Sequence, residues 1–316
     1  MSVRGPERVH DARAILGEGP LWDVARRVLW WVDILDGLVH AFDPVAGTDR
    51  AVALGTEVGC VAPMVDGRLV VATTDRILAL EPEGGGCETL VTFDPAPVRL
   101  RCNDGRCDPA GRLWVGRIAF DGADGHGSLL RLDPDGRLST MLAGLAIPNG
   151  LAWPSDGRTL AYIDSARREV TRYPYDPASG DLGPGTTLLS LEGLDLPTGA
   201  VPDGMAIDED DGLWVAVWGG SCVLHVSPDG TVLDRLELPV SQPSSCAFGG
   251  PDLADLYVTS AREELGPESE AREPHAGGIF RFRPGVRGRP AAAFRWLDPG
   301  DPVAASQRLG RAARET

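Results

Sequence analysis

Oxygen-bearing side chains recur at one position of a repeating pattern in this sequence. Six segments each contain an apolar strand, then a turn rich in Asp, Gly and Pro, and then a second apolar strand. Five residues before these turns stand Glu18, Val61, Asn103, Asn149, Asp203 and Ser244. Four of the six positions supply a carboxylate or amide oxygen, and none supplies an imidazole or a thiolate. Such a donor set suits a hard divalent cation such as Ca²⁺, Mg²⁺ or Mn²⁺, with water completing the coordination.

The spacing of the repeat indicates which fold brings these side chains together. The turns are anchored at Asp23, Asp66, Asp108, Pro154, Asp208 and Gly249, at intervals of 41 to 54 residues. The second strand reads Leu-Trp-Val or Leu-Tyr-Val at 113–115, 213–215 and 256–258. This period is typical of a four-stranded propeller blade. We therefore predict an all-β protein, a six-bladed β-propeller with four-stranded antiparallel blades.

The repeats also predict the domain organisation. They fill nearly the whole chain, so we expect a single propeller domain over residues 1–303 and a polar C-terminal tail over 304–316. The longest interval precedes the fifth repeat, and we expect residues 181–202 to form a surface excursion there. A pair of β-sandwiches with coincidental spacing is the alternative.

A propeller would gather the recurrent oxygen donors at one place. Equivalent positions of successive blades are related by rotation about the central axis, so residues just before the innermost strands meet at the mouth of the channel. Glu18, Asn103, Asn149 and Asp203 are therefore expected to share a small space. Any Asp or Asn here could alone be an ordinary turn residue. Two neighbouring carboxylates repel each other unless a cation lies between them, and the shared repeat position favours a metal site.

Composition excludes several classes of function. The chain has 46 acidic residues against 30 basic ones, all of them arginine, and a net charge of -16, which repels nucleic acid. Lysine-based mechanisms are excluded, and the sequence has neither a G-x-S-x-G elbow nor an H-E-x-x-H motif. It also lacks a signal-peptide core and a membrane-spanning apolar stretch, so we expect a cytoplasmic protein without membrane contact. Its six scattered cysteines are expected to be reduced thiols.

Five stretches resemble the SMP-30/gluconolactonase/regucalcin-like family of six-bladed propellers. They are L-G-E-G-P-L-W-D at 16–23, R-C-N-D-G-R-C-D-P-A-G-R-L-W-V-G at 101–116, P-N-G-L-A-W at 148–153, P-D-G-M-A-I-D at 202–208 and L-Y-V-T-S-A at 256–261. The resemblance implies that Glu18, Asn149 and Asp203 bind one divalent cation, which could be Ca²⁺, Zn²⁺, Mn²⁺, Mg²⁺ or Fe²⁺. It also implies that Arg101 and Asn103 contact the substrate.

Arg101 and two further residues bear on the substrate. Arg101 stands two residues before Asn103, so on an extended segment both side chains project to the same side, where an arginine can donate several hydrogen bonds. A surface arginine covering a strand edge is the alternative. Asp121 stands near the place where some sugar-lactone members of the family have a glutamate, and its shorter side chain leaves the sugar open. His126 lies in the same loop.

The resemblance implies hydrolysis of a sugar lactone, an aldonolactone of the gluconolactone type, to the aldonic acid. Asp203 is then the candidate for orienting or deprotonating the attacking water while it binds the metal. We expect a monomer whose partner is a small-molecule lactone. Two alternatives stay open: another hydrolase of lactones or phosphotriesters, which an apolar rim in place of Arg101 would favour, and a metal-binding regulatory protein without turnover.

Overall fold

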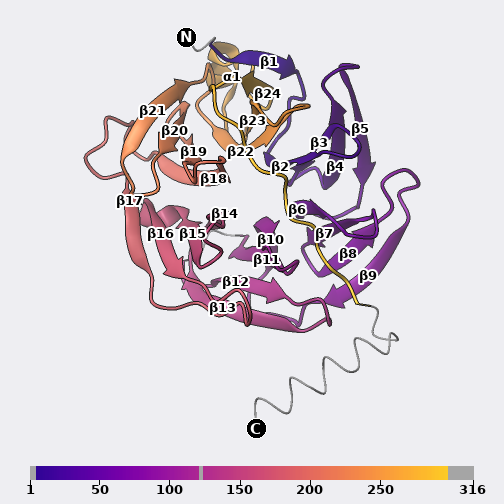
Figure 1. The fold of residues 1–316 in the computed structure, drawn as a ribbon. Helices are drawn as coiled ribbons and strands as arrows, with labels where there is room; N and C mark the ends of the chain where they lie inside the picture. The colour runs from indigo at the N-terminus through magenta and orange to yellow at the C-terminus, as the bar shows by residue number, and fades with distance from the viewer. Residues whose placement is uncertain (1–4, 121–123, 298–316) are drawn as a thin grey trace.

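Six four-stranded antiparallel sheets surround a central axis in the computed structural model, which describes residues 5–120 and 124–297 (Figure 1). The first three blades are β2 (Gly17–Asp23), β3 (Val28–Asp33), β4 (Leu38–Asp43) and β5 (Thr48–Ala53); β6 (Val58–Pro63), β7 (Leu69–Thr73), β8 (Arg76–Leu80) and β9 (Cys87–Thr92); and β10 (Leu100–Cys107), β11 (Leu113–Ala119), β12 (Gly127–Leu132) and β13 (Leu138–Leu145). The fourth and fifth are β14 (Pro148–Ala152), β15 (Thr159–Asp164), β16 (Glu169–Pro174) and β17 (Thr186–Ser190); and β18 (Val201–Ile207), β19 (Leu213–Trp218), β20 (Cys222–Val226) and β21 (Val232–Glu237). The prediction of a six-bladed propeller is confirmed.

The sixth blade joins the two ends of the described chain. It contains β22 (Pro243–Gly249), β23 (Asp255–Ser260), β24 (Ile279–Phe282) and β1 (Glu7–His10), in the order β1-β24-β23-β22. Glu7 pairs with Arg281 in the β1–β24 ladder, and the Arg281 guanidinium donates to the Glu7 carboxylate over 2.6 Å. The N-terminal strand therefore closes the ring, a pairing that the sequence did not predict.

Burial falls from the axis outward within each blade. Every residue of β2, β14 and β22 is buried, whereas outer strands such as β5 and β9 are mostly exposed. β17 lies inside residues 181–202, so the expected surface excursion was wrong there: these residues include the outer strand of the fourth blade. Helical structure in the described chain is a 3₁₀ turn (Ser165–Arg167) and α1 (Pro267–Arg272), and neither is long or apolar enough to cross a membrane.

A hydrogen-bonded clamp explains why the turn motif repeats. The carboxylate at the end of an innermost strand accepts from the indole N–H of a tryptophan on the next strand. These pairs are Asp23 with Trp30 at 3.2 Å, Asp108 with Trp114 at 3.0 Å and Asp208 with Trp214 at 2.9 Å. The same aspartates accept backbone N–H groups of the turn that follows, as Asp108 does from Ala110. The clamp fixes the turn that joins the two inner strands of a blade.

Residues 286–297, which we call the strap, cross one end of the channel after the sixth blade (Figure 1). Gly288 N–H donates to Leu253 O over 2.8 Å, and Phe294 N–H donates to Pro63 O over 2.7 Å. Further along, Arg295 N–H donates to a carbonyl of the third blade, and the Phe294 side chain is fully buried. The strap therefore packs against the propeller, whereas the predicted tail, 304–316, lies outside the described residues.

Candidate metal and substrate site

The polar repeat positions all lie on innermost strands, β2, β10, β14 and β18, close to the axis (Figure 1). Glu18 and Asn149 are second in their strands, Asp203 is third and Asn103 is fourth, and all four side chains are buried. The innermost strands are equivalent under the rotation that relates the blades, so they run in one direction along the channel. We call the end with these residues the upstream end.

Each innermost strand has an irregularity in its pairing at this level. The shifts fall between Glu18 and Leu21, Val58 and Cys60, Cys102 and Gly105, Asn149 and Leu151, Pro202 and Met205, and Pro243 and Ser245. A bulge breaks the regular alternation of a strand and re-aims the side chains beside it. This explains why the consecutive residues Asn103 and Asp104 are both buried near the axis.

Glycines after the acidic and amide residues let neighbouring innermost strands approach closely. A Cβ on Gly150 would lie 2.8 Å from the backbone oxygen of Asp203. A Cβ on Gly204 would lie 2.9 Å from Ser245 Cα. Side chains larger than hydrogen would push these strands apart and widen the ring of polar groups.

Hydrogen bonds link the substrate and metal candidates into one chain. Arg101 Nη1 donates to Asn103 Oδ1 over 2.7 Å, so the prediction that these two side chains lie on the same side is confirmed. Asn103 Nδ2 donates to Asn149 Oδ1 and to Pro148 O, both over 2.9 Å. A carbonyl can only accept, so Pro148 fixes the orientation of the Asn103 amide. Asn149 Nδ2 in turn donates to Ser165 Oγ over 2.9 Å.

Buried acids dominate the electrostatics of the upstream end. Burial, reinforced by the nearby charge of Asp104, raises the pKa of Glu18 to about 8. Burial and the charges of Glu18 and Asp104 raise the pKa of Asp203 well above its usual range, and Arg101 opposes the shift. Glu18 Oε2 accepts the Gly19 N–H over 2.8 Å, which compensates its charge only in part. If Glu18, Asp104 and Asp203 were all ionised, Arg101 alone would not balance their negative charge.

That imbalance is what a bound cation would correct. Glu18 and Asp203 offer carboxylates and Asn149 an amide oxygen, which are ligands preferred by hard divalent cations. In the described part of the chain, no three or more His, Cys, Asp and Glu side chains form a group that could hold a metal ion. The proposed set contains only two such residues, because its third ligand, Asn149, is an amide. The donor chemistry and the buried acids fit a divalent cation.

The structure adds residues that the sequence did not single out. Asp104 is buried, and its Oδ2 has no hydrogen-bond partner among the described residues. Glu263 follows β23, and its charge raises the pKa of both Glu18 and Asp203. Asp104 is adjacent to Asn103 in the sequence. In a regular strand, neighbouring side chains point to opposite faces, so the sequence would place Asp104 away from the site. Asp121 lies outside the described residues, and His126 is exposed.

Residues 16–262 match the family described as the SMP-30/gluconolactonase/LRE-like region. This chain belongs to that family.

Relatives match this family member over most of their length. It is 38% identical to the 6-deoxy-6-sulfogluconolactonase of Pseudomonas putida over 87% of this chain and 93% of the relative. It is 35% identical to the pentonolactonase XacC of Haloferax volcanii, over 90% and 96%. The crystal structure of a calcium-binding protein, regucalcin, from Agrobacterium tumefaciens superposes with a TM-score of 0.87 at 28% identity, covering 93% of this chain and 98% of that one.

Proposed function

We propose that this protein is a divalent-metal-dependent hydrolase that opens a sugar lactone of the gluconolactone type to the aldonic acid. The chain is a lactone-hydrolysing enzyme, as its relatives named 6-deoxy-6-sulfogluconolactonase and pentonolactonase indicate. The observation that carries the finer proposal is the group of buried donors Glu18, Asn149 and Asp203, joined through Asn103 to a partly accessible arginine. A small-molecule lactone is the expected partner.

Three residues would hold the cation. Glu18 and Asp203 contribute charge, and Asn149 is oriented by its bonds to Asn103 and Ser165. A bound cation would polarise the lactone carbonyl and stabilise the negative charge that develops on its oxygen. Calcium is the first cation to test, because the similar Agrobacterium structure is that of a calcium-binding protein and oxygen ligands suit calcium.

Asp203 would act as the general base. With the cation bound, the Asp203 carboxylate would be ionised, and it would orient or deprotonate the attacking water while it binds the metal. The water oxygen adds to the lactone carbonyl carbon, the ring C–O bond breaks, and the proton passes to the departing ring oxygen. Arg101 and Asn103 would hold the lactone oxygens and fix its orientation during this step. No covalent intermediate is needed.

A proton-release assay on a panel of aldonolactones tests this proposal. We expect turnover that disappears after EDTA treatment, returns with one divalent cation and is lost in Asp203→Asn. An exposed aspartate in the loop before β18 provides the matched control, Asp195→Asn, which should keep full activity. Absence of turnover by metal-loaded protein on every lactone would refute the proposal, and phosphotriesters would be tested next.

A further inference from the structure

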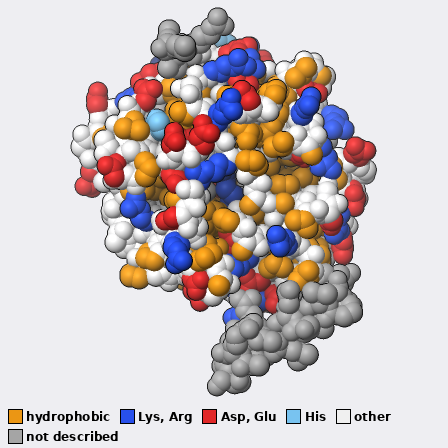
Figure 2. Space-filling model, in the orientation of Figure 1, with side chains coloured by type: hydrophobic (Ala, Val, Ile, Leu, Met, Phe, Trp, Pro, Cys, Tyr) orange, Lys and Arg blue, Asp and Glu red, His pale blue; other side chains and the backbone are white. Residues whose placement is uncertain are grey.

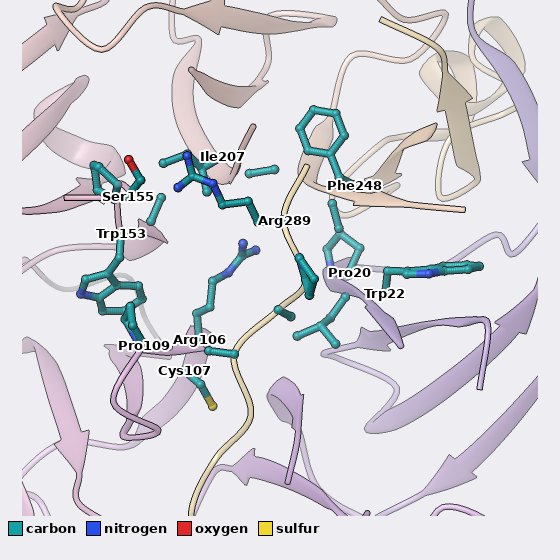
Figure 3. Close-up of a pocket in the computed structure, with 18 of the residues that line it drawn as sticks. Pro20, Trp22, Arg106, Cys107, Pro109, Trp153, Ser155, Ile207, Phe248 and Arg289 are labelled. Atoms are coloured by element: carbon teal, nitrogen blue, oxygen red, sulfur yellow. The ribbon is translucent and has the colours of Figure 1, made fainter. Parts of the chain in front are cut away.

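A cavity lies at the downstream end of the channel, and Figure 3 shows the residues that line it. Its volume is about 380 Å³, within the range of small-molecule sites. Five of its lining residues each follow a polar position by three residues: Leu21 after Glu18, Arg106 after Asn103, Ala152 after Asn149, Ala206 after Asp203 and Ala247 after Ser244. At about 3.3 Å per strand residue, the cavity lies roughly 10 Å down the channel from the metal candidates.

Small side chains leave this end hollow. Alanine occupies the equivalent position in three consecutive blades, at Ala152, Ala206 and Ala247. Met64 has this position in the second blade, where it bridges to Phe294 of the strap. Strap residues 289–292 supply another wall. The cavity is therefore bounded by strand ends and by the strap, which packs against them.

Arg106 brings a cationic group into this cavity, and its charge acts on the buried carboxyl of Asp104, two residues earlier on β10. Figure 3 shows its side chain rising between Trp153 and Pro20, in the middle of the lining residues. No hydrogen bond or ion pair joins it to any residue in 5–120 or 124–297. Arg289, by contrast, already donates to Asp211 Oδ1 over 2.7 Å and to Glu209 O over 2.8 Å. Arg106 therefore keeps its planar set of donors for an external acceptor.

Apart from Arg289 and Ser155, the other lining residues are apolar. Trp22, Trp153 and Phe248 line the cavity, and so do Pro20, Pro109, Pro154 and Pro290. Trp22 stacks on Tyr257 with ring centroids 5.8 Å apart, which fixes its plane. On the face crossed by the strap, Figure 2 shows arginine side chains near the centre, with both hydrophobic and acidic side chains next to them. A guanidinium without a hydrogen-bond partner among largely apolar walls is complementary to an anion that carries an apolar body.

We propose that this cavity binds a small organic carboxylate with a flat apolar body. The carboxylate accepts two hydrogen bonds from the Arg106 guanidinium, and the body packs against apolar lining residues such as Leu21, Ala206 and Pro290. An inorganic anion would leave the apolar walls in contact with water, and a neutral sugar would leave the guanidinium unpaired. This site is separate from the proposed lactone site and does not depend on its metal.

Calorimetric titration with sodium benzoate tests the proposal on the intact protein. We expect saturable binding that Arg106→Gln weakens about tenfold or more, because charge-assisted hydrogen bonds are lost. Arg50→Gln removes an exposed arginine on β5 and should leave the affinity unchanged. Benzamide, which has the same ring without the charge, should bind about tenfold more weakly than benzoate. Absence of saturable benzoate binding, or equal binding to Arg106→Gln, would overturn the proposal.

Further experiments test which end of the channel binds benzoate. Ala247→Leu fills the cavity and should weaken binding while the melting transition stays cooperative. EDTA treatment and Asp203→Asn alter only the upstream end, so both should leave the benzoate affinity unchanged. A loss of binding on either of these treatments would place benzoate at the metal site and would contradict the assignment to the Arg106 cavity.

Discussion

The two ends of the channel are built from the same strands but have opposite chemistry. At the upstream end, Glu18 and Asp203 are buried carboxyls with raised pKa values. Three residues further along, the strands carry leucine, alanine and one arginine, Arg106, around an apolar cavity. The upstream end is therefore suited to a cation and the downstream end to an anion.

This difference shows how a repeat fold separates scaffold from function. The clamp pairs Asp23–Trp30, Asp108–Trp114 and Asp208–Trp214 keep their geometry from blade to blade. The positions that face the channel differ between blades, because rotation brings them together without requiring them to be alike. A few substitutions on equivalent strands can therefore produce two unlike sites about 10 Å apart.

Asp203→Asn should have the largest effect on the upstream end. It keeps the size of the side chain but removes a metal ligand and the candidate base, so we expect kcat to fall by about 10²–10⁴-fold. Steady-state proton release measures this change, with Asp195→Asn as the matched exposed control. Retention of more than half of the activity would remove Asp203 from the mechanism.

Phe294→Ala should lower the stability of the protein at the downstream end without changing any residue proposed to bind metal or lactone. Phe294 is fully buried where the strap meets Met64, so truncation should cost about 3–5 kcal/mol of unfolding free energy. Urea denaturation measures this loss. Val65→Ala, an exposed position beside the same contact, is expected to change the free energy by about 0.5 kcal/mol or less. Equal, small effects at both positions would show that the strap does not stabilise the propeller.

Arg101→Gln should separate binding from chemistry at the upstream end. The variant removes the charge that can hold lactone oxygens, so we expect KM to rise about tenfold with kcat largely kept. Measuring both constants on the preferred lactone tests this split. A fall in kcat at constant KM would instead place Arg101 in transition-state stabilisation.

The buried acids should make the metal-free protein less stable at higher pH. Burial and Asp104 raise the pKa of Glu18 from 4.5 to about 8, so the folded protein holds a proton that the unfolded chain releases over this interval. Stability therefore falls as pH rises from about 4.5 to about 8. Thermal melting of EDTA-treated protein should show a declining Tm, with a shallower decline in Glu18→Gln. A Tm that rises over this range would contradict the proposed environment of Glu18.

Much of the fold could be predicted because propeller blades repeat in sequence as well as in space. Turn residues such as Asp108 and the Leu-Trp-Val strands mark each blade at a near-constant interval. The closing strand β1 could not be found this way, because four residues at the N-terminus carry no repeat signal. The strap also lies outside the repeats. Its contacts join residues far apart in the chain, which sequence spacing does not reveal.

The site could be predicted in part. Repeat position grouped Glu18, Asn103, Asn149 and Asp203, and the family resemblance then assigned all but Asn103 to the metal. Strand alternation was enough to pair Arg101 with Asn103. Asp104 was missed because the irregular pairing between Cys102 and Gly105 breaks that alternation. Nothing in the sequence distinguishes Arg106 from other strand residues. The cavity beside it arises because equivalent positions on other blades carry alanine.

The most direct test of the central claim is to measure activity against bound metal in one titration. Metal-depleted protein is titrated with calcium, and then with the other divalent cations, while lactone hydrolysis and metal content are recorded together. The proposed site predicts that activity rises in proportion to bound metal and saturates at one equivalent, and that Asn149→Ala weakens both. Full lactonase activity in the metal-depleted protein would contradict the account.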